Sequence, residues 1–204
     1  MAAAEWVKLM KDGAGERERD KWNQRYREGT HGTLPPDSLL IDAFDRYIEP
    51  LFPNAGHALD IAGGTGRHAI FLADKGWKVR MTDIAETGIV SAQKNAGSLA
   101  SQIEFQVEDL TLFQGSNESY DLITVFFFLR RELFGELVKA LKPGGLLIYK
   151  GYTRVQTRFG GGPTNPAFLF EEKELLNSFR ELHVLHYAEL IRDCGMAELV
   201  GRKI

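Results

Sequence analysis

The sequence predicts an α/β protein with a doubly wound, mostly parallel seven-stranded sheet, helices on both faces and a helical cap at the N-terminus. Apolar strand-like runs alternate with helical patterns from residue 57 onward, which is typical of parallel strands joined by crossover helices. A glycine-rich turn follows the first of these strands. Only Asp193, Cys194 and Gly195 separate the last two strand-like runs, and so short a connection cannot contain a crossover helix. The C-terminal strand is therefore expected to be antiparallel.

The N-terminal cap is expected to contain two helices. Trp22 and Tyr26 lie four positions apart in a charged stretch, so they share one face of a helix. A second helix is expected to begin after Asp37 or Ser38, either of which can cap it, and to be ended by Pro50 and Pro53.

The core is expected to span residues 56–204, behind a cap of residues 1–55, in a single domain, since 204 residues suffice for one sizeable hydrophobic core. Its strands are expected at 57–62, 77–82, 103–107, 120–128, 145–150, 181–191 and 196–203. Its helices are expected at 66–75, 86–96, 131–141 and 171–178. Residues 151–166 form the one long loop in this series, and loops of that length often act as lids or substrate elements.

Composition limits the classes of partner. The net charge of -3 gives no overall positive field, which argues against nucleic acid and favours a small molecule. A single cysteine, Cys194, cannot form an internal disulfide, and it is expected to lie far from the site. No leader pattern opens the chain, and the longest strongly apolar stretch, 122–129, is too short to cross a bilayer. A cytoplasmic protein with no membrane partner is expected, and the oligomeric state is left open.

The run from Ala58 to His68 carries the main functional signal. A short apolar strand leads into three glycines and then into a helical pattern, which offers bare backbone to a ligand at a helix N-terminus. Asp83 closes the next strand, 23 positions after Asp60, where doubly wound folds place an acid that accepts hydrogen bonds from ribose hydroxyls. Together these two signals predict a site for a nucleotide-type cofactor.

Four segments, in this order, resemble the landmarks of the Rossmann-like S-adenosylmethionine-dependent methyltransferases: Leu59–Arg67, Val107–Leu110, Tyr120–Ile123 and Leu141–Gly145. Two further segments, Asp20–Tyr26 and Phe168–Leu176, resemble more narrowly the tellurite-resistance type of small-molecule methyltransferase. One difference concerns the glycine turn, because this family usually has glycine at the position of Ala62 and another residue at the position of Gly63.

The resemblance implies S-adenosyl-L-methionine as the cofactor. Asp60 would order the glycine turn or reach the amino group of the methionine part, Asp83 would hold the ribose, Ile84 would pack on adenine, and Asp109 would accept from the adenine amine. The residues implied in cofactor binding are Trp22, Arg25, Tyr26, Asp60, Ala62, Gly63, Gly64, Gly66, Asp83, Ile84, Asp109, Leu110 and Phe126. Ordinary structural roles are open to several of them: a helix cap for Asp83, a turn for Asp109, and coverage of the core for the cap aromatics.

The methyl acceptor is expected at the carboxyl ends of the fourth and fifth strands. The residues predicted to contact it are His31, Phe128, Arg130 and Tyr152. Arg130, Arg131, Arg154 and Arg158 suggest a positively charged rim that would favour an anionic, thiol or chalcogen acceptor. No residue stands out as a catalytic base, and the histidines show no metal-ligand spacing, so no metal site is expected.

Two other functions fit parts of the same pattern. A nicotinamide-dependent oxidoreductase shares the glycine turn and the ribose acid, although its usual plan has a separate substrate domain and lacks the antiparallel closing strand. A non-catalytic S-adenosylmethionine-binding protein is the other alternative, because no base for the acceptor is evident.

Overall fold

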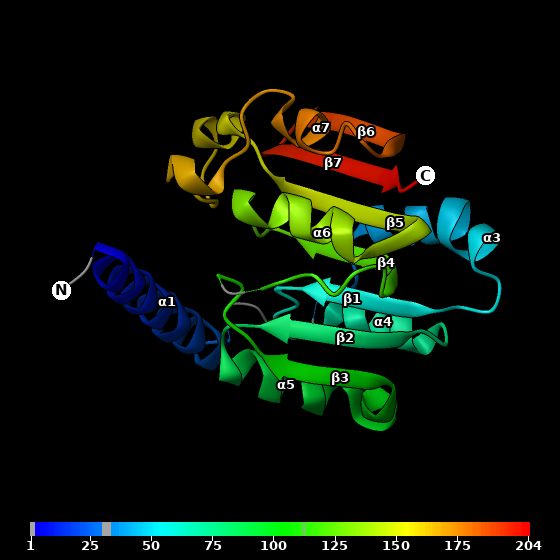
Figure 1. Ribbon diagram of the computed structural model, residues 1–204, viewed down its shortest axis with the longest axis horizontal. Helices are drawn as coiled ribbons and strands as arrows, with labels where there is room; N and C mark the ends of the chain where they lie inside the picture. Colours follow the sequence, from blue (N-terminus) through cyan, green and yellow to red (C-terminus); the bar gives the residue numbers. More distant parts are fainter. Residues whose placement is uncertain (1–2, 30–33, 112) are drawn as a thin grey trace.

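The computed structural model describes residues 3–29, 34–111 and 113–204, with the side chains of the first helix described from Gly15 onward. Its centre is a seven-stranded sheet in the order β3-β2-β1-β4-β5-β7-β6 (Figure 1). The strands are β1 (His57–Ile61), β2 (Lys78–Asp83), β3 (Ile103–Val107), β4 (Tyr120–Phe126), β5 (Leu141–Tyr152), β6 (His183–Ile191) and β7 (Gly195–Arg202). The strand order reverses between β1 and β4, and doubly wound folds bind their ligands at the carboxyl ends of the strands beside such a reversal.

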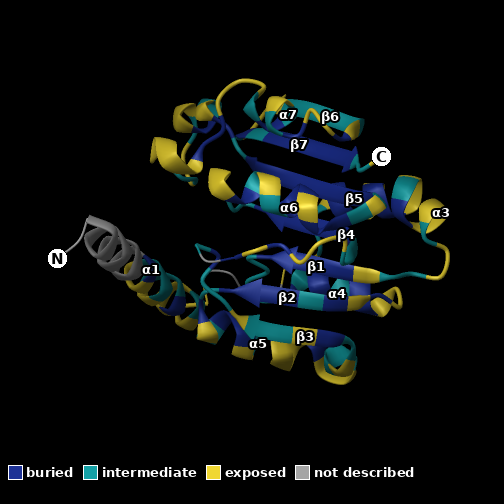
Figure 2. Ribbon diagram, viewed as in Figure 1, coloured by how far each residue is buried: buried dark blue, intermediate teal, exposed yellow. Residues whose placement is uncertain are grey.

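Helices cover both faces of the sheet. The α-helices are α1 (Ala3–Arg27), α2 (Ser38–Ala43), α3 (Glu49–Leu51), α4 (Arg67–Asp74), α5 (Glu86–Ala96), α6 (Phe134–Ala140) and α7 (Glu174–Ser178). The π-helical η1 (Phe44–Ile48) joins α2 to α3, and the shorter 3-10 segments are η2 (Gly97–Gln102), η3 (Arg131–Leu133), η4 (Arg154–Arg158) and η5 (Pro166–Phe168). Apolar residues of α2, η1, α4 and α5 form a core on one face, and those of α6 and α7 form a second core on the other (Figure 2).

The parallel strands β1 and β4 lie in the middle of the sheet and are buried on both sides, which explains their nearly continuous apolar sequences. Their alternate residues pack into the two different cores: Ala58 and Leu122 into one, Leu59 and Ile123 into the other. The few polar residues in these strands, such as Asp60, therefore lie in a nearly water-free environment.

The closing strand runs antiparallel, as predicted. β7 pairs antiparallel with β5 and with β6, and Glu198 lies opposite Lys150 on one side and Ala188 on the other. The short connection between Ile191 and Gly195 forms the hairpin that this topology requires.

Several predicted boundaries need correction. The fourth strand ends at Phe126 instead of residue 128, because Phe127 has a left-handed backbone with φ of +58° that leaves the extended conformation. The fifth strand extends to Tyr152, and η4 follows at once, so the predicted 151–166 loop is shorter and partly helical. The helix predicted over 131–141 begins with a 3-10 turn.

The second helix of the cap ends just before Pro53, but not at Pro50. Pro50 lies in the first turn of α3, where a missing backbone N–H disturbs the helical hydrogen bonds least, so the chain stays helical from Ser38 to Leu51. Within the described parts of the chain, no helix has both the length and the apolar character needed to cross a bilayer.

Candidate functional site

The glycine turn after β1 offers its backbone directly to the space above it. Ala62, Gly64 and Gly66 all have positive φ, of +54°, +59° and +87°, and Gly66 is the N-cap of α4. A Cβ added at Gly64 would lie 2.8 Å from the Tyr26 hydroxyl, and one added at Gly63 would meet the side chains below the turn. Side chains at these two positions would therefore collide with Tyr26, Asp60 or Met81, and their absence leaves the backbone of the turn bare.

Asp83, at the end of β2, is buried beside this turn. Its Oδ2 accepts from the Gly64 N–H at 2.9 Å, and its Oδ1 accepts from the Ala85 N–H at 2.8 Å. The Tyr26 hydroxyl also donates to this carboxylate. Burial raises the pKa of Asp83, although these donors act in the opposite direction. Asp83 thus supports the turn into α5 and at the same time presents a carboxylate at the edge where a ribose is predicted.

Asp60 lies beneath the same turn, and one of its two carboxylate oxygens makes no hydrogen bond with the described residues. Its Oδ1 accepts from the Thr124 hydroxyl at 2.8 Å, whereas its Oδ2 has no hydrogen-bond partner among the described residues. Burial raises the pKa of Asp60 to about 7. A Cβ at Gly63 would lie 2.7 Å from Oδ2, so this oxygen faces the bare part of the turn. A buried acceptor without a partner at this place fits a ligand that carries a donor such as an ammonium group.

Helix α1 covers the turn from outside. The Tyr26 ring packs over Gly64 and Gly88, where an added Cβ at either glycine would collide with it. The Trp22 and Tyr26 rings stack with centroids 5.8 Å apart, and the guanidinium of exposed Arg25 lies 4.9 Å from the Trp22 ring. The predicted cap residues therefore lie together at the site, with Tyr26 in direct contact with Asp83.

Asn23, on the same helix, is a residue that sequence reasoning missed. The N-cap residue of α5, Ala85, has no side chain able to cap a helix. Instead, the buried Asn23 accepts with Oδ1 from the Thr87 N–H at 3.0 Å, and the Thr87 hydroxyl lies 2.8 Å from the same oxygen. Helix α1 therefore supplies the cap of α5 from a position 64 residues away, and no local motif could have revealed this contact.

The residues predicted around adenine lie at the carboxyl ends of β2 and β3. Ile84 is half-buried, and Leu110 is packed into the core. Asp109 accepts from the Thr111 N–H at 2.9 Å and so forms a turn, while Gly15 of α1 passes close to its carboxylate.

Aromatic side chains dominate the carboxyl ends of β4 and β5. Phe126 is largely buried against His68, with ring centroids 4.0 Å apart. The Phe127 ring lies 5.3 Å from the Tyr152 ring, and the Arg67 guanidinium lies 5.6 Å from Phe127. Strained backbone such as that of Phe127 is concentrated at functional sites.

Tyr152 also lies near the free thiol. Burial and, after it, the proximity of Cys194 raise the pKa of Tyr152. The expectation that Cys194 is remote from the site therefore needs correction, because the hairpin brings it back beside the end of β5. Of the other predicted acceptor residues, Phe128 and Arg130 are half-buried after β4, and His31 lies outside the described residues.

A buried charge cluster behind these aromatics was not predicted either. Lys150 lies 2.9 Å from Asp37 Oδ1 and 2.9 Å from Glu198 Oε1. His68 Nε2 accepts from the Asp37 backbone N–H at 3.3 Å. Burial, followed by the charges of Arg67 and Lys150, holds the pKa of His68 well below its usual range. The cluster ties the start of α2 to the sheet.

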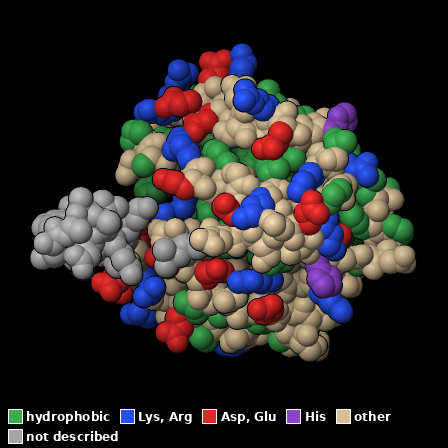
Figure 3. Space-filling view, in the orientation of Figure 1, with side chains coloured by type: hydrophobic (Ala, Val, Ile, Leu, Met, Phe, Trp, Pro, Cys, Tyr) green, Lys and Arg blue, Asp and Glu red, His purple; other side chains and the backbone are tan. Residues whose placement is uncertain are grey.

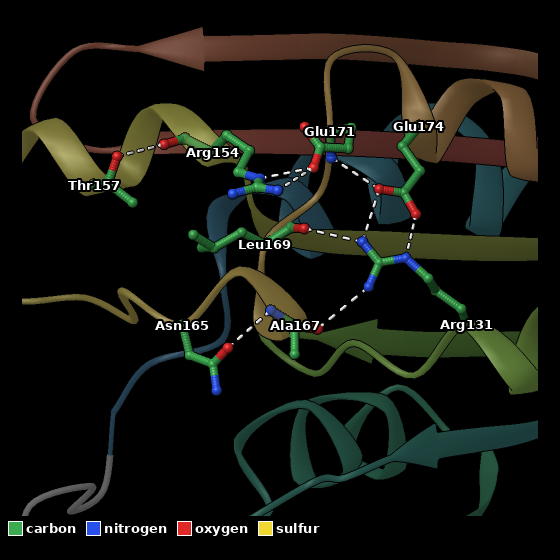
Figure 4. A network of polar contacts seen from close by, with 8 residues as sticks. All are labelled: Arg131, Arg154, Thr157, Asn165, Ala167, Leu169, Glu171 and Glu174. Carbon is green, nitrogen blue, oxygen red and sulfur yellow. Dashed lines mark hydrogen bonds and ion pairs between the residues drawn. The ribbon is translucent and has the colours of Figure 1, made fainter.

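The predicted arginine rim is wrong for two of its four members (Figure 4). Arg131 forms a double contact with Glu174, and Arg154 pairs with Glu171. The surface hollow beside Arg131, about 580 Å³ in volume, is lined by one arginine and several glutamates: Arg131, Glu171, Glu172, Glu174, Asn177 and Ser178. An anion gains little there, because the local cation is already paired with a carboxylate.

No group of three or more histidine, cysteine or acidic side chains is placed to hold a metal ion within the described ranges.

Residues 58–145 match a family model described as a methyltransferase domain. A demethylmenaquinone methyltransferase of Clavibacter sepedonicus is 33% identical over 128 residues, which covers 60% of this chain and 51% of that protein. The chain spans about half the length of the curated relatives it matches. The match thus covers the part of the chain that contains the glycine turn, Asp83 and Asp109.

Solved structures extend the likeness to most of the chain. TehB from Haemophilus influenzae superposes with a TM-score of 0.67 at 18% identity, covering 89% of this chain and 67% of that one. A SAM-dependent methyltransferase from Methanosarcina mazei superposes with a TM-score of 0.63 at 20% identity, covering 78% and 97%. At these identities the likeness establishes the fold: the Rossmann-like sheet with its antiparallel closing strand.

Proposed function

We propose that this chain contains a methyltransferase domain of the Rossmann-like, S-adenosylmethionine-dependent type and that it transfers a methyl group to a small-molecule acceptor. The observation that carries the proposal is the group formed by the glycine turn, the half-satisfied Asp60 and the Asp83 carboxylate at the carboxyl ends of β1 and β2. These residues fit the cofactor in kind, since they combine bare backbone, a ribose acid and an unused buried acceptor.

S-adenosyl-L-methionine, when bound, supplies a methyl group on a positively charged sulfur. Asp83 would hold the ribose hydroxyls with a carboxylate that Gly64 and Ala85 already keep in place. Asp60 would face the ammonium group of the methionine part. The Tyr26 hydroxyl donates a hydrogen bond to the Asp83 carboxylate. Tyr26 is therefore expected to give up or share this bond when the ribose hydroxyls bind there. Helix α1 would then shield the reacting groups from water, which favours direct transfer.

The chemistry at the acceptor end favours a nucleophile that needs no base. Burial raises the pKa of Tyr149 and of Tyr152. The Nε2 lone pair of His68 accepts from the Asp37 N–H, and Lys150 is kept charged by two carboxylates. None of these four groups is free to take a proton. A thiolate or another soft chalcogen anion is already nucleophilic, so we propose this class of acceptor.

An aromatic acceptor is the second candidate. The Phe127 and Tyr152 rings lie in contact and would offer an aromatic wall to a planar molecule, and some relatives are named as demethylmenaquinone methyltransferases. Mixed charge on the molecular surface supports a small acceptor over a nucleic acid, because basic and acidic side chains alternate over the face in Figure 3. With one cysteine and this fold, a cytoplasmic location is the simplest setting.

Calorimetric titration tests the cofactor assignment. S-adenosylhomocysteine should bind, and Asp83→Asn should weaken it by about 1–3 kcal/mol, because the amide carries no charge for the ribose hydroxyls. Asp121→Asn is the matched control, since Asp121 pairs with Lys142 at the opposite end of the sheet. Binding of NAD in place of S-adenosylhomocysteine would favour the oxidoreductase alternative and overturn the proposal.

An acceptor screen tests the transfer itself. Formation of S-adenosylhomocysteine should be much faster with thiophenol, which ionises near neutral pH, than with phenol, which does not, if the acceptor must bring its own nucleophile. Preference for phenol would favour the aromatic class with a base still to be found. Cofactor binding without turnover of any acceptor would favour the non-catalytic alternative.

A further inference from the structure

The segment between β5 and α7 is held over the end of the sheet by one arginine (Figure 4). Arg131 is the first residue of η3, shortly after β4. Its guanidinium donates to the carbonyl oxygen of Leu169 at 3.0 Å and to that of Ala167 at 3.3 Å. These carbonyls stand on either side of Phe168, so a single side chain fixes the backbone around that residue.

Glu174 holds the arginine in turn. Glu174 accepts from Nη2 of Arg131 at 2.9 Å and also from Nε, which gives the forked arrangement that only an arginine can make. The same carboxylate accepts from the Glu171 N–H at 2.8 Å, and the Glu171 side chain pairs with Arg154. Arg131 is thus the centre of a network that joins β4, the segment around Phe168 and the start of α7.

Phe168 is the residue that this network presents outward. Its neighbours Leu169 and Phe170 are fully buried, whereas Phe168 itself is 39% exposed. Its ring lies 5.4 Å from the Lys21 ammonium, and that ammonium lies 5.9 Å from the Trp22 ring on α1. The helix that covers the cofactor side and the segment that follows β5 therefore meet at this contact.

We propose that Arg131 is a positioning residue for the acceptor: it holds η5 so that Phe168 closes the acceptor side of the site against α1. The inference rests on the proposed function, because it places the acceptor at the ends of β4 and β5. In this role Arg131 affects acceptor affinity and leaves cofactor affinity unchanged, since its hydrogen bonds within the described part of the chain go to the segment after β5 and to α7.

Direct binding of an anionic acceptor by Arg131 makes opposite predictions for two variants. If Arg131 bound the anion directly, removing Glu174 would free the guanidinium and improve acceptor binding. If Arg131 is a positioning residue, removing Glu174 would loosen it and weaken acceptor binding. Arg131→Lys keeps the charge and would largely preserve direct binding, but an ammonium cannot reach two carbonyls and a carboxylate with the same fork.

The experiment compares Arg131→Ala, Arg131→Lys, Glu174→Ala and Phe168→Ala, with Arg158→Ala as the control, because Arg158 is an exposed arginine of the same segment. With thiophenol as the probe acceptor, the first four variants should raise its KM by about fivefold or more, with KM for S-adenosylmethionine unchanged. The three variants of Arg131 and Glu174 should also speed hydrogen exchange at the Phe168, Leu169 and Phe170 amides. Arg158→Ala should leave both measurements at wild-type values.

Hydrogen exchange keeps the inference separate from the proposed function. Wild-type exchange at residues 168–170 in Arg131→Ala would overturn the clamp, whether or not the protein methylates thiophenol. Faster exchange with an unchanged thiophenol KM, or a lower KM in Glu174→Ala, would overturn the positioning role. Unaltered titration with S-adenosylhomocysteine shows that each variant is folded, and failure of wild-type protein to bind it would overturn the proposed function instead.

Discussion

Ala62 holds a left-handed backbone conformation that a side chain makes unfavourable. Its φ is +54°, at the first position of the glycine turn, where the family that the sequence resembles usually has glycine. For an L-residue with a Cβ this conformation costs about 1–2 kcal/mol. The tight connection between β1 and α4 imposes the conformation, and the turn retains it in spite of the alanine.

Ala62→Gly should therefore stabilise the protein by about 1 kcal/mol, because glycine adopts positive φ without a steric penalty, partly offset by its greater freedom in the unfolded chain. Urea denaturation measures the change. Ala69→Gly is the opposing control: Ala69 is a buried residue within α4, where glycine should destabilise. A loss of stability in Ala62→Gly would contradict the strain at this turn.

Asp60 should make the stability of the cofactor-free protein depend on pH. Burial raises its pKa from 3.8 to about 7, so between these values the folded state keeps a proton that the unfolded chain has released. The contribution of this residue to stability is therefore complete at acid pH and is lost as the pH rises toward 7. Between about pH 5 and about pH 8, the free energy of unfolding measured by denaturation should fall less in Asp60→Asn than in wild type. An equal loss in both proteins would mean that Asp60 is already ionised.

At the scale of elements, the cofactor side depends on one helix capping another. Helix α5 follows Asp83 directly, and its first turn bonds Asn23 of α1 through Thr87. Three neighbouring contacts therefore link α1 to the turn after Asp83: Asn23 with Thr87, Asp83 with Ala85, and Tyr26 with Asp83.

Asn23→Ala should lower stability by about 1 kcal/mol, the usual effect of losing a helix cap. It should also weaken S-adenosylhomocysteine binding, because the turn that carries Asp83 loses its outer support. Thermal unfolding and calorimetric titration measure the two effects. Gln24→Ala is the control, since the exposed Gln24 bonds Glu28 on its own helix. Lost stability with unchanged affinity would reduce Asn23 to a structural cap.

Sequence patterns predicted the elements well where the signal was local. The apolar runs of β4 and β5 placed both strands, although β5 begins at Leu141, before the Gly-Gly pair that was expected to start it, and the three-residue hairpin predicted the direction of β7. The errors arose where distant contacts decide. Phe127 reads as a strand residue but adopts positive φ, with its N–H bonded to Lys150 O, and Arg131 reads as a free cation because Glu174 lies 43 residues further on.

At the scale of the whole molecule, Lys150 joins the cap to the sheet. It is nearly buried, and its two partners come from the start of α2 and from β7. His186 Nε2 lies 3.5 Å from Glu198 on the far side of the cluster. Nothing near Lys150 in the sequence marks it as paired, since Asp37 is 113 residues away, and so the cluster could not be predicted from the sequence.

Lys150→Ala should destabilise the protein by about 3–5 kcal/mol, because it leaves two buried carboxylates without a cation. Lys142→Ala is the matched control from the same strand. Lys142 pairs with Asp121 near the surface, where removal of an ion pair changes stability by less than about 1 kcal/mol. Urea denaturation of both variants should separate the two values clearly, and similar values would contradict the importance of the buried cluster.

The two segments that meet at Lys21 and Phe168 come from opposite sides of the family-matched region, residues 58–145. The α1 segment bonds α5 and Asp83, whereas the segment around Phe168 supplies no strand of the sheet and lies after the strands that present Asp60 and Asp83. If Phe168 closes the acceptor side as proposed, a recombination event with two junctions between Tyr152 and Glu171 would exchange acceptor preference in one step. A lineage could acquire a new substrate in this way while inheriting its cofactor chemistry unchanged.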